Sequence, residues 1–247
     1  MILEVCCGNL ESVHAAVRGG AQRVELCSQL ELDGLTPSWE DLRTARSLYP
    51  QLRIHVLIRP RAGDFCYTPA EVETMSKEIE TALDLGADGV VIGALTRHGD
   101  VDREAMTELC GMVSAWAAAR ALQGGLCHAS NDTHYFEAES PEPAITFHRA
   151  FDVCRKPFQA MEEIIGLGCS RILTSGQAAS ALEGAALIRE LRARAAGRII
   201  LLPGGGIRPD NARRILEATS CTELHSSARL PGSPFTDPGI VSALLNP

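Results

Sequence analysis

The 247-residue chain carries 23 Lys and Arg residues against 31 Asp and Glu residues, a formal net charge of −8. This acidic balance argues against a broad nucleic-acid surface or an anionic-membrane surface, and no apolar run approaches the roughly 20 residues of a membrane span. The nine cysteines include no CxxC pair, which argues against a zinc ribbon or a thioredoxin-type motif. The opening MILEVCCGNL does not resemble a signal peptide, so we expect reduced thiols and a cytoplasmic location.

Short apolar runs alternate with amphipathic segments along the whole chain. The runs that predict strands span residues 2–6, 22–27, 53–59, 88–92, 144–149, 170–175, 198–203 and 222–227. Helices are expected at 9–19, 38–48, 69–85, 102–122, 157–167, 178–195, 209–218 and 235–245. Eight consecutive strand–helix units in about 250 residues predict one (β/α)8 TIM barrel over residues 1–247, with a doubly wound open sheet as the less fitting alternative.

The least regular stretch of the sequence is 123–143, between the fourth expected helix and the fifth expected strand. In a barrel, this connection lies at the N-terminal face, away from the usual position of a functional site. We expect a mobile polar loop. The alternative is a metal cluster formed by Cys127, His128 and His134.

Strand alternation predicts a polar barrel interior, because successive side chains of a strand point to opposite faces. If Leu3 and Val5 face the helices, then Glu4 and Cys6 face inward. The second strand repeats this pattern. The same assignment turns a larger set inward: Arg23, Glu25, Cys27, His55, Arg59, Thr146, His148, Ser175, Glu223, His225 and Ser227.

A set of this kind has two interpretations. Buried polar groups without partners cost several kcal/mol each, so an inert network would pair Glu4 or Glu25 with Arg23, Arg59 or Arg171. The alternative is a functional site, because polar clusters in pockets are typical of sites and TIM barrels carry theirs at the C-terminal strand ends.

Two loops at the same end predict anion binding. Gly204–Gly206 follows the seventh strand, where exposed backbone N–H groups could hold a phosphate or carboxylate together with Ser175, although a tight turn is the alternative. Arg59 and Arg61 follow the third strand and could fork onto an anionic substrate, or pair locally with Asp64. We therefore expect an anion near Gly205, Gly206 and one of these two arginines.

Taken in order, eight segments of the sequence resemble the CutC copper homeostasis family. They are LEVC (3–6), GGAQRVELCSQLELDGLTPS (19–38), IRPRAGDFCYT (58–68), LGADGVVIGAL (85–95), TFHRAFD (146–152), RILTSG (171–176), PGGGIR (203–208) and ELHSSA (223–228). The resemblance implies the barrel fold, a cytoplasmic setting, homo-oligomers such as dimers or tetramers, and binding of Cu(I).

The positions that match the family's proposed copper thiols are Cys6 and Cys27. Cu(I) is soft and prefers thiolate ligands. Neighbouring strands lie about 4.8 Å apart, so one ion could bridge both thiols; two buried free cysteines are the alternative. No organic cofactor is indicated. The sequence departs from the family at Cys7-Gly8, where a hydrophobic or polar residue and an acid are more usual, and in the length of 123–143.

Two thiols leave the other polar residues unexplained, which keeps an enzyme open as the alternative function. It would be an isomerase, lyase or hydrolase acting on a small anionic or phosphorylated metabolite. His148 or His225 would be the general acid or base, oriented by Glu25 or Asp152. A third hypothesis, a scaffold that binds a protein partner, predicts a patch elsewhere and no polar interior.

Overall fold

Eight strands and eight α-helices alternate in the computed structural model, which describes residues 1–124 and 142–247. The strands are β1 (Ile2–Cys7), β2 (Arg23–Leu26), β3 (Arg53–Leu57), β4 (Gly89–Ile92), β5 (Ala144–Phe147), β6 (Arg171–Thr174), β7 (Ile200–Pro203) and β8 (Glu223–Ser226). The α-helices are α1 (Leu10–Arg18), α2 (Trp39–Leu48), α3 (Pro69–Asp84), α4 (Arg103–Gly124), α5 (Pro157–Gly166), α6 (Ala185–Ala195), α7 (Ala212–Thr219) and α8 (Pro238–Leu245). Two 3-10 turns that the sequence did not predict, η1 (Leu30–Leu32) and η2 (Arg149–Val153), follow β2 and β5.

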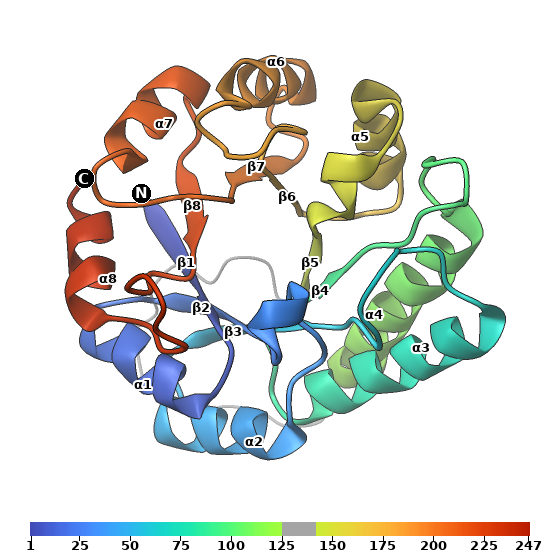
Figure 1. Ribbon diagram of the computed structural model, residues 1–247. Coiled ribbons are helices and arrows are strands. Elements are labelled where there is room, and N and C mark those ends of the chain that lie inside the picture. Colours follow the sequence, from blue (N-terminus) through green and yellow to red (C-terminus); the bar gives the residue numbers. More distant parts are fainter. Residues whose placement is uncertain (125–141) are drawn as a thin grey trace.

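The strands form one parallel sheet in the order β7-β6-β5-β4-β3-β2-β1-β8. A parallel bridge between Gly204 and His225 joins the two ends of this sheet. The helices surround the strands as an outer ring (Figure 1). The predicted (β/α)8 barrel is therefore confirmed, and the alternative of a doubly wound open sheet is wrong.

Several helices begin at residues that cap them by their own chemistry. The Asn9 side chain accepts a hydrogen bond from the N–H of Ser12 at 2.8 Å, and Thr68 forms a capping box with Glu71. The helix expected at 178–195 is wrong in its first residues, because α6 begins only at Ala185. A Cβ atom on the preceding Gly184 would lie 1.9 Å from the carbonyl oxygen of Ser175, so the chain packs closely against the end of β6 before the helix starts.

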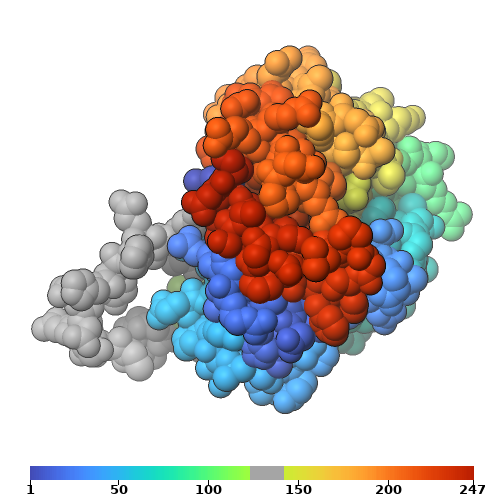
Figure 2. Space-filling model, turned by 60° about the vertical axis from the view of Figure 1, so that its left-hand side comes forward, coloured from blue at the N-terminus to red at the C-terminus, as the bar shows by residue number. Residues whose placement is uncertain are grey.

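An apolar layer fills the space between the strands and the surrounding helices. Strand residues such as Leu3, Val5 and Val24 are at most 1% exposed and pack against the buried faces of the helices. The C-terminal segment, in red, lies beside the blue N-terminal segment in Figure 2, in agreement with the packing of α8 against α1.

No helix within the described residues combines the length and apolarity that crossing a membrane requires.

A network of ion pairs fills part of the barrel interior. The guanidinium of Arg23 contacts Glu4 at 2.8 Å and also pairs with Glu223, which accepts a second hydrogen bond from Nε of Arg171 at 3.1 Å. Burial opposes ionisation of both acids. Arg23, together with hydrogen bonds from His225 and His55, nevertheless holds the pKa of Glu4 well below its usual value, and Arg23 and Arg171 hold the pKa of Glu223 below its own. Of the pairs considered from the sequence, Glu4 with Arg23 is present, whereas Arg171 pairs with Glu223, an acid that the sequence interpretation did not include.

We expect the Arg23→Met variant to lose about 3–5 kcal/mol of unfolding free energy, because it leaves the buried carboxylates of Glu4 and Glu223 short of a cation. Denaturant unfolding followed by circular dichroism measures this loss. Arg198→Met is the control, since Arg198 pairs with Glu162 at 2.6 Å on the surface and should matter little. Equal stability of the two variants would contradict the importance of the interior network.

Candidate functional site

A cavity of about 350 Å³ lies at the C-terminal ends of the strands. Its volume falls within the range of small-molecule sites. Its apolar lining includes Leu57, Phe65 and Leu173. Most of its polar lining comes from residues at or just beyond strand ends: Cys6, Glu25, Cys27, Arg59, His148, Arg149, Asp152 and His225.

The two thiols expected to bind a metal lie side by side in this cavity. The Sγ atoms of Cys6 and Cys27 are 3.6 Å apart, and one ligand atom from each of Cys6, Glu25 and Cys27 lies within 4.8 Å of the others. This is the one group of three or more metal-ligating side chains that residues 1–124 and 142–247 contain. The alternative cluster at Cys127, His128 and His134 lies outside the described residues.

Both thiols hold their protons strongly. The mutual hydrogen bond with Cys27, together with burial, raises the pKa of Cys6 well above its ordinary value. For Cys27, the hydrogen bond to Cys6 lowers the pKa, but burial and the nearby Glu25 carboxylate outweigh it and raise the pKa overall. The free site is therefore a pair of neutral thiols at neutral pH, and a cation that binds there must displace their protons.

His225 lies between two carboxylates and links the cavity to the interior network. Its Nδ1 atom is 2.9 Å from Glu4, and its Nε2 atom is 3.4 Å from Glu25. Burial lowers the pKa of His225, but Glu25 and Glu4 outweigh it and raise the pKa well above the usual value. Burial also raises the pKa of Glu25. Two ionisable groups with shifted pKa values therefore face each other in the cavity lining, which is an arrangement suited to general acid–base chemistry.

His148 lies in the cavity wall as a neutral imidazole. Its Nδ1 atom accepts a hydrogen bond from the N–H of Ala150 at 3.1 Å, and its buried Nε2 atom has no hydrogen-bond partner among the described residues. Burial and the charge of Arg59 lower the pKa of His148 to about 3. With Nδ1 accepting, the proton of the neutral ring is on Nε2. This state favours a hydrogen-bond donor over the general acid or base expected from the sequence.

The two arginines after β3 have different surroundings, since only Arg59 lines the cavity. Arg59 lines the cavity, is 4% exposed, and donates hydrogen bonds to the carbonyl groups of Leu32, Gly34 and Gly63. None of the described carboxylates forms an ion pair with it. Arg61 does not line the cavity, because its guanidinium is held by Glu71 at 2.5 Å and by Asp64 at 2.9 Å. Arg61 makes the local pairing with Asp64 that was considered from the sequence, and a role for it at an anion site stays a prediction.

Asp152 and Ser175 orient Arg149, a residue that the strand pattern did not place in the site. The carboxylate of Asp152 accepts hydrogen bonds from the N–H of Ser175 at 3.0 Å and from Nε of Arg149 at 2.8 Å. The Ser175 hydroxyl in turn accepts from Nη2 of Arg149 at 3.1 Å and donates to the carbonyl of Ala178 at 2.7 Å. Asp152 therefore positions Arg149 rather than a histidine. Strand alternation missed Arg149 because β5 ends at Phe147 and η2 redirects the chain.

The glycine loop after β7 lies next to Arg149, one of the residues that line the cavity. Gly204 bridges to His225 and donates its N–H to the carbonyl of Thr174 at 2.9 Å, so it serves barrel closure. A Cβ atom on Gly205 would lie 3.7 Å from Cζ of Arg149. The arginine beside this loop is thus Arg149, which the sequence interpretation of the anion site did not name.

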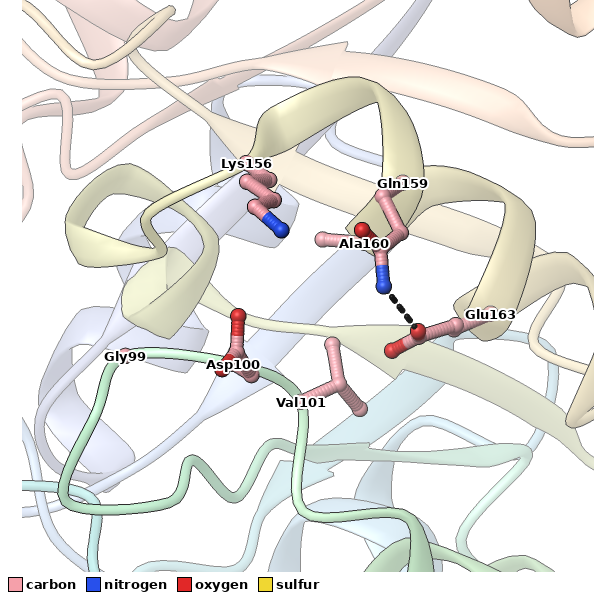
Figure 3. Close-up of a pocket in the computed structure, with 7 residues that line it drawn as sticks. All are labelled: Gly99, Asp100, Val101, Lys156, Gln159, Ala160 and Glu163. Atoms are coloured by element: carbon pink, nitrogen blue, oxygen red, sulfur yellow. Dashed lines mark hydrogen bonds between the residues drawn. The ribbon is translucent and has the colours of Figure 1, made fainter.

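A second hollow lies between the loop after β4 and the start of α5 (Figure 3). Gly99, Asp100, Lys156 and Glu163 are among its lining residues, and Figure 3 shows the side chains of Asp100, Lys156 and Glu163 around a gap beside the backbone at Gly99. Its volume of about 10 Å³ accommodates no more than one water molecule. It does not compete with the cavity as a ligand site.

Comparisons with known proteins agree on one family. The model of the CutC family matches residues 1–123 and 129–230. A CutC family protein of Bacteroides thetaiotaomicron is 47% identical over 226 residues, covering 92% of this chain and 80% of that protein. A CutC family protein of Chromobacterium violaceum is 46% identical over 228 residues, covering 92% of this chain and 81% of that protein.

Solved structures agree with the sequences. The CutC protein of Streptococcus agalactiae, which is named for copper homeostasis, superimposes with a TM-score of 0.76 at 28% identity and covers 92% of this chain and 98% of its own. A phosphoribosylanthranilate isomerase of Thermotoga maritima gives a TM-score of 0.57 at 15% identity, covering 100% of this chain and 97% of its own. At that identity it shows the barrel fold alone.

The state of His148 can be tested by NMR. Because its pKa of about 3 lies far below the ordinary value, we expect its ring to stay neutral, with the proton on Nε2, from pH 8 down to about pH 5. Long-range ¹H–¹⁵N spectra of the uniformly labelled protein read this tautomer directly. Titration of His148 near pH 6.5 would contradict the assignment.

Proposed function

The chain belongs to the CutC family, and from that premise and the geometry of the cavity we propose that it binds Cu(I) through Cys6 and Cys27 as a copper homeostasis protein. The observation that carries the proposal is the 3.6 Å separation of the two sulfur atoms inside the cavity. Cu(I) favours thiolates at low coordination number, and hard cations favour oxygen ligands. Glu25, the third member of the group, offers one carboxylate oxygen beside the sulfurs.

The charges of the cavity suit an ion held by two thiolates. Cu(I) and two thiolates together carry one negative charge, and the cavity supplies cations against it in Arg59 and in the protonated form of His225. The remaining negative group is Glu25, whose carboxylate faces Nε2 of His225 at 3.4 Å and is therefore balanced by the proton on that ring. We take Cys6 and Cys27 as the ligands and Glu25 as a support for them.

Location and assembly are proposals of the same kind. The eight cysteines within the described residues are all free thiols, which suits the reducing cytoplasm. A cytoplasmic homo-oligomer, either a dimer or a tetramer, is what the family resemblance implies. Size-exclusion chromatography with light scattering measures the assembly.

We expect the Cys6→Ser, Cys27→Ser double variant to bind Cu(I) at least about 100-fold more weakly than the unaltered protein, beyond the 10–100-fold that loss of a supporting group costs. Anaerobic competition titration with a Cu(I) chelator measures the affinity. Cys66→Ser is the control, because Cys66 is partly exposed in the loop after β3 and lies outside the cavity lining. Unchanged affinity in the double variant would refute Cys6 and Cys27 as ligands.

Binding of Cu(I) should release protons. Because both thiols are protonated in the free protein, the apparent affinity should fall as the pH falls, by up to about two orders of magnitude per pH unit. Calorimetry in two buffers of different ionisation enthalpy counts the protons. A Cu(I) affinity that does not change between pH 6 and 8 would contradict binding as a dithiolate.

A second candidate function is catalysis on a small anionic metabolite, and one observation favours it. The buried Nε2–H group of His148 has no partner among the described residues, although it lies in the wall of a cavity that is large enough for a metabolite. A thiol site for copper has no use for this donor. In the enzyme hypothesis, Glu25 and His225 exchange the proton and His148 polarises an oxygen of the substrate. Turnover that is lost in Glu25→Gln and kept in Cys66→Ser would support it.

A further inference from the structure

The peptide groups after β7 leave two neighbouring N–H donors unused. The carbonyl oxygen of Gly205 accepts a hydrogen bond from Ala181 at 2.9 Å, and that of Gly206 accepts from Asn211 at 2.8 Å. In trans peptides, the next N–H points opposite to each carbonyl, so those of Gly206 and Ile207 point away from these partners. Neither donates a hydrogen bond to any described residue. Successive free backbone N–H groups of this kind are the donors from which anion-binding turns are built.

Arg149 adds a fixed positive charge next to this loop. Its Nε and Nη2 atoms are engaged by Asp152 and Ser175, and Nη1 donates to no described residue. The same Nη1 atom would lie 3.8 Å from a Cβ atom on Gly205, and Arg149 also lines the cavity. A guanidinium held at two of its nitrogens keeps its third aimed in one direction, which favours binding of a planar or tetrahedral oxyanion.

His148 supplies an independent sign of a ligand in the adjoining space. It is the chain neighbour of Arg149, is 5% exposed, and has the unpartnered Nε2 atom in the cavity wall. A buried donor without an acceptor costs free energy that a bound acceptor restores. Arg59, which lines the same cavity without a carboxylate partner among the described residues, also favours an occupant with negative charge.

We propose that the mouth of the barrel holds an oxyanion subsite, formed by Arg149 and the N–H groups of Gly206 and Ile207, for a small metabolite whose other end accepts a hydrogen bond from His148. The anionic group is a phosphate monoester or a carboxylate, and the other end carries a carbonyl or carboxylate oxygen. The subsite deepens the enzyme candidate by naming its substrate class. It does not depend on Cu(I), because neither thiol takes part.

The test begins with inorganic phosphate, which probes the subsite alone. We expect phosphate to shift the amide signals of Gly206 and Ile207 in ¹H–¹⁵N spectra of the full-length protein, and Arg149→Gln to weaken its binding at least about tenfold. Arg198→Gln is the matched control, because the side chains of Arg149 and Arg198 are 47% and 46% exposed and each pairs with one acid. Equal weakening in both variants, or amide shifts elsewhere, would overturn the subsite. Acetate in place of phosphate tells a carboxylate site from a phosphate site.

The second probe is phosphoglycolate, which carries a phosphate and a carboxylate on one short chain. We expect His148→Phe to weaken phosphoglycolate binding about tenfold and to leave the affinity for inorganic phosphate unchanged. Loss of both affinities, or of neither, would refute His148 as the second anchor. These are binding measurements and do not depend on turnover. A protein that binds phosphoglycolate through Arg149 and His148 but converts no such metabolite would therefore contradict the enzyme candidate and still support the subsite. Cu(I) titration of Arg149→Gln should match the unaltered protein.

Discussion

The ionic interior of the barrel is the constraint on which the rest of the site depends. Most barrels of this kind fill their centre with branched apolar side chains, whereas this one places Glu4, Arg23 and Glu223 there at 0–3% exposure. Each charge is tolerable only because the others surround it. The network therefore fixes its members tightly, and the next layer of side chains toward the mouth is built against it.

The charge of Glu4 determines the protonation and orientation of the side chains in that next layer. Its carboxylate stays ionised beside Arg23, and it also contacts Nδ1 of His55 at 3.0 Å and Nδ1 of His225 at 2.9 Å. His225 is thereby held with its other nitrogen toward Glu25 and the cavity. The ion-pair network and the cavity lining are thus continuous, because His225 contacts Glu4 on one side and Glu25 on the other.

Regular geometry accounts for the features that could be predicted from the sequence. Strand alternation placed Glu4, Cys6, Glu25, Cys27 and His225 inside the barrel, and eight repeated units indicated its architecture. Strand alternation did not predict the positions of side chains that lie just beyond the end of a strand. Beyond β5, the turn η2 carries Arg149 into the cavity and uses Asp152 to hold it. Beyond β3, Arg61 bends to Asp64 and Glu71, while its neighbour Arg59 stays inside. Periodicity has no information about such turns, since their direction depends on contacts with distant loops.

Charge decides what the mouth can hold. A Cu(I) ion bound by two thiolates and a phosphorylated metabolite are chemically unlike, yet each brings negative charge to the same cavity. Arg59 has no carboxylate partner among residues 1–124 and 142–247, and the proton on His225 adds a second cation to the cavity lining. Burial of these two cations is unfavourable in the free protein because it removes them from water, and a negatively charged occupant would offset that unfavourable free energy. A site whose only task was to shield two thiols from water would be more stable with apolar residues in these positions. The arginines, the neutral donor of His148 and the free N–H groups after β7 are therefore better explained by an occupant with oxygen atoms than by the sulfur pair alone.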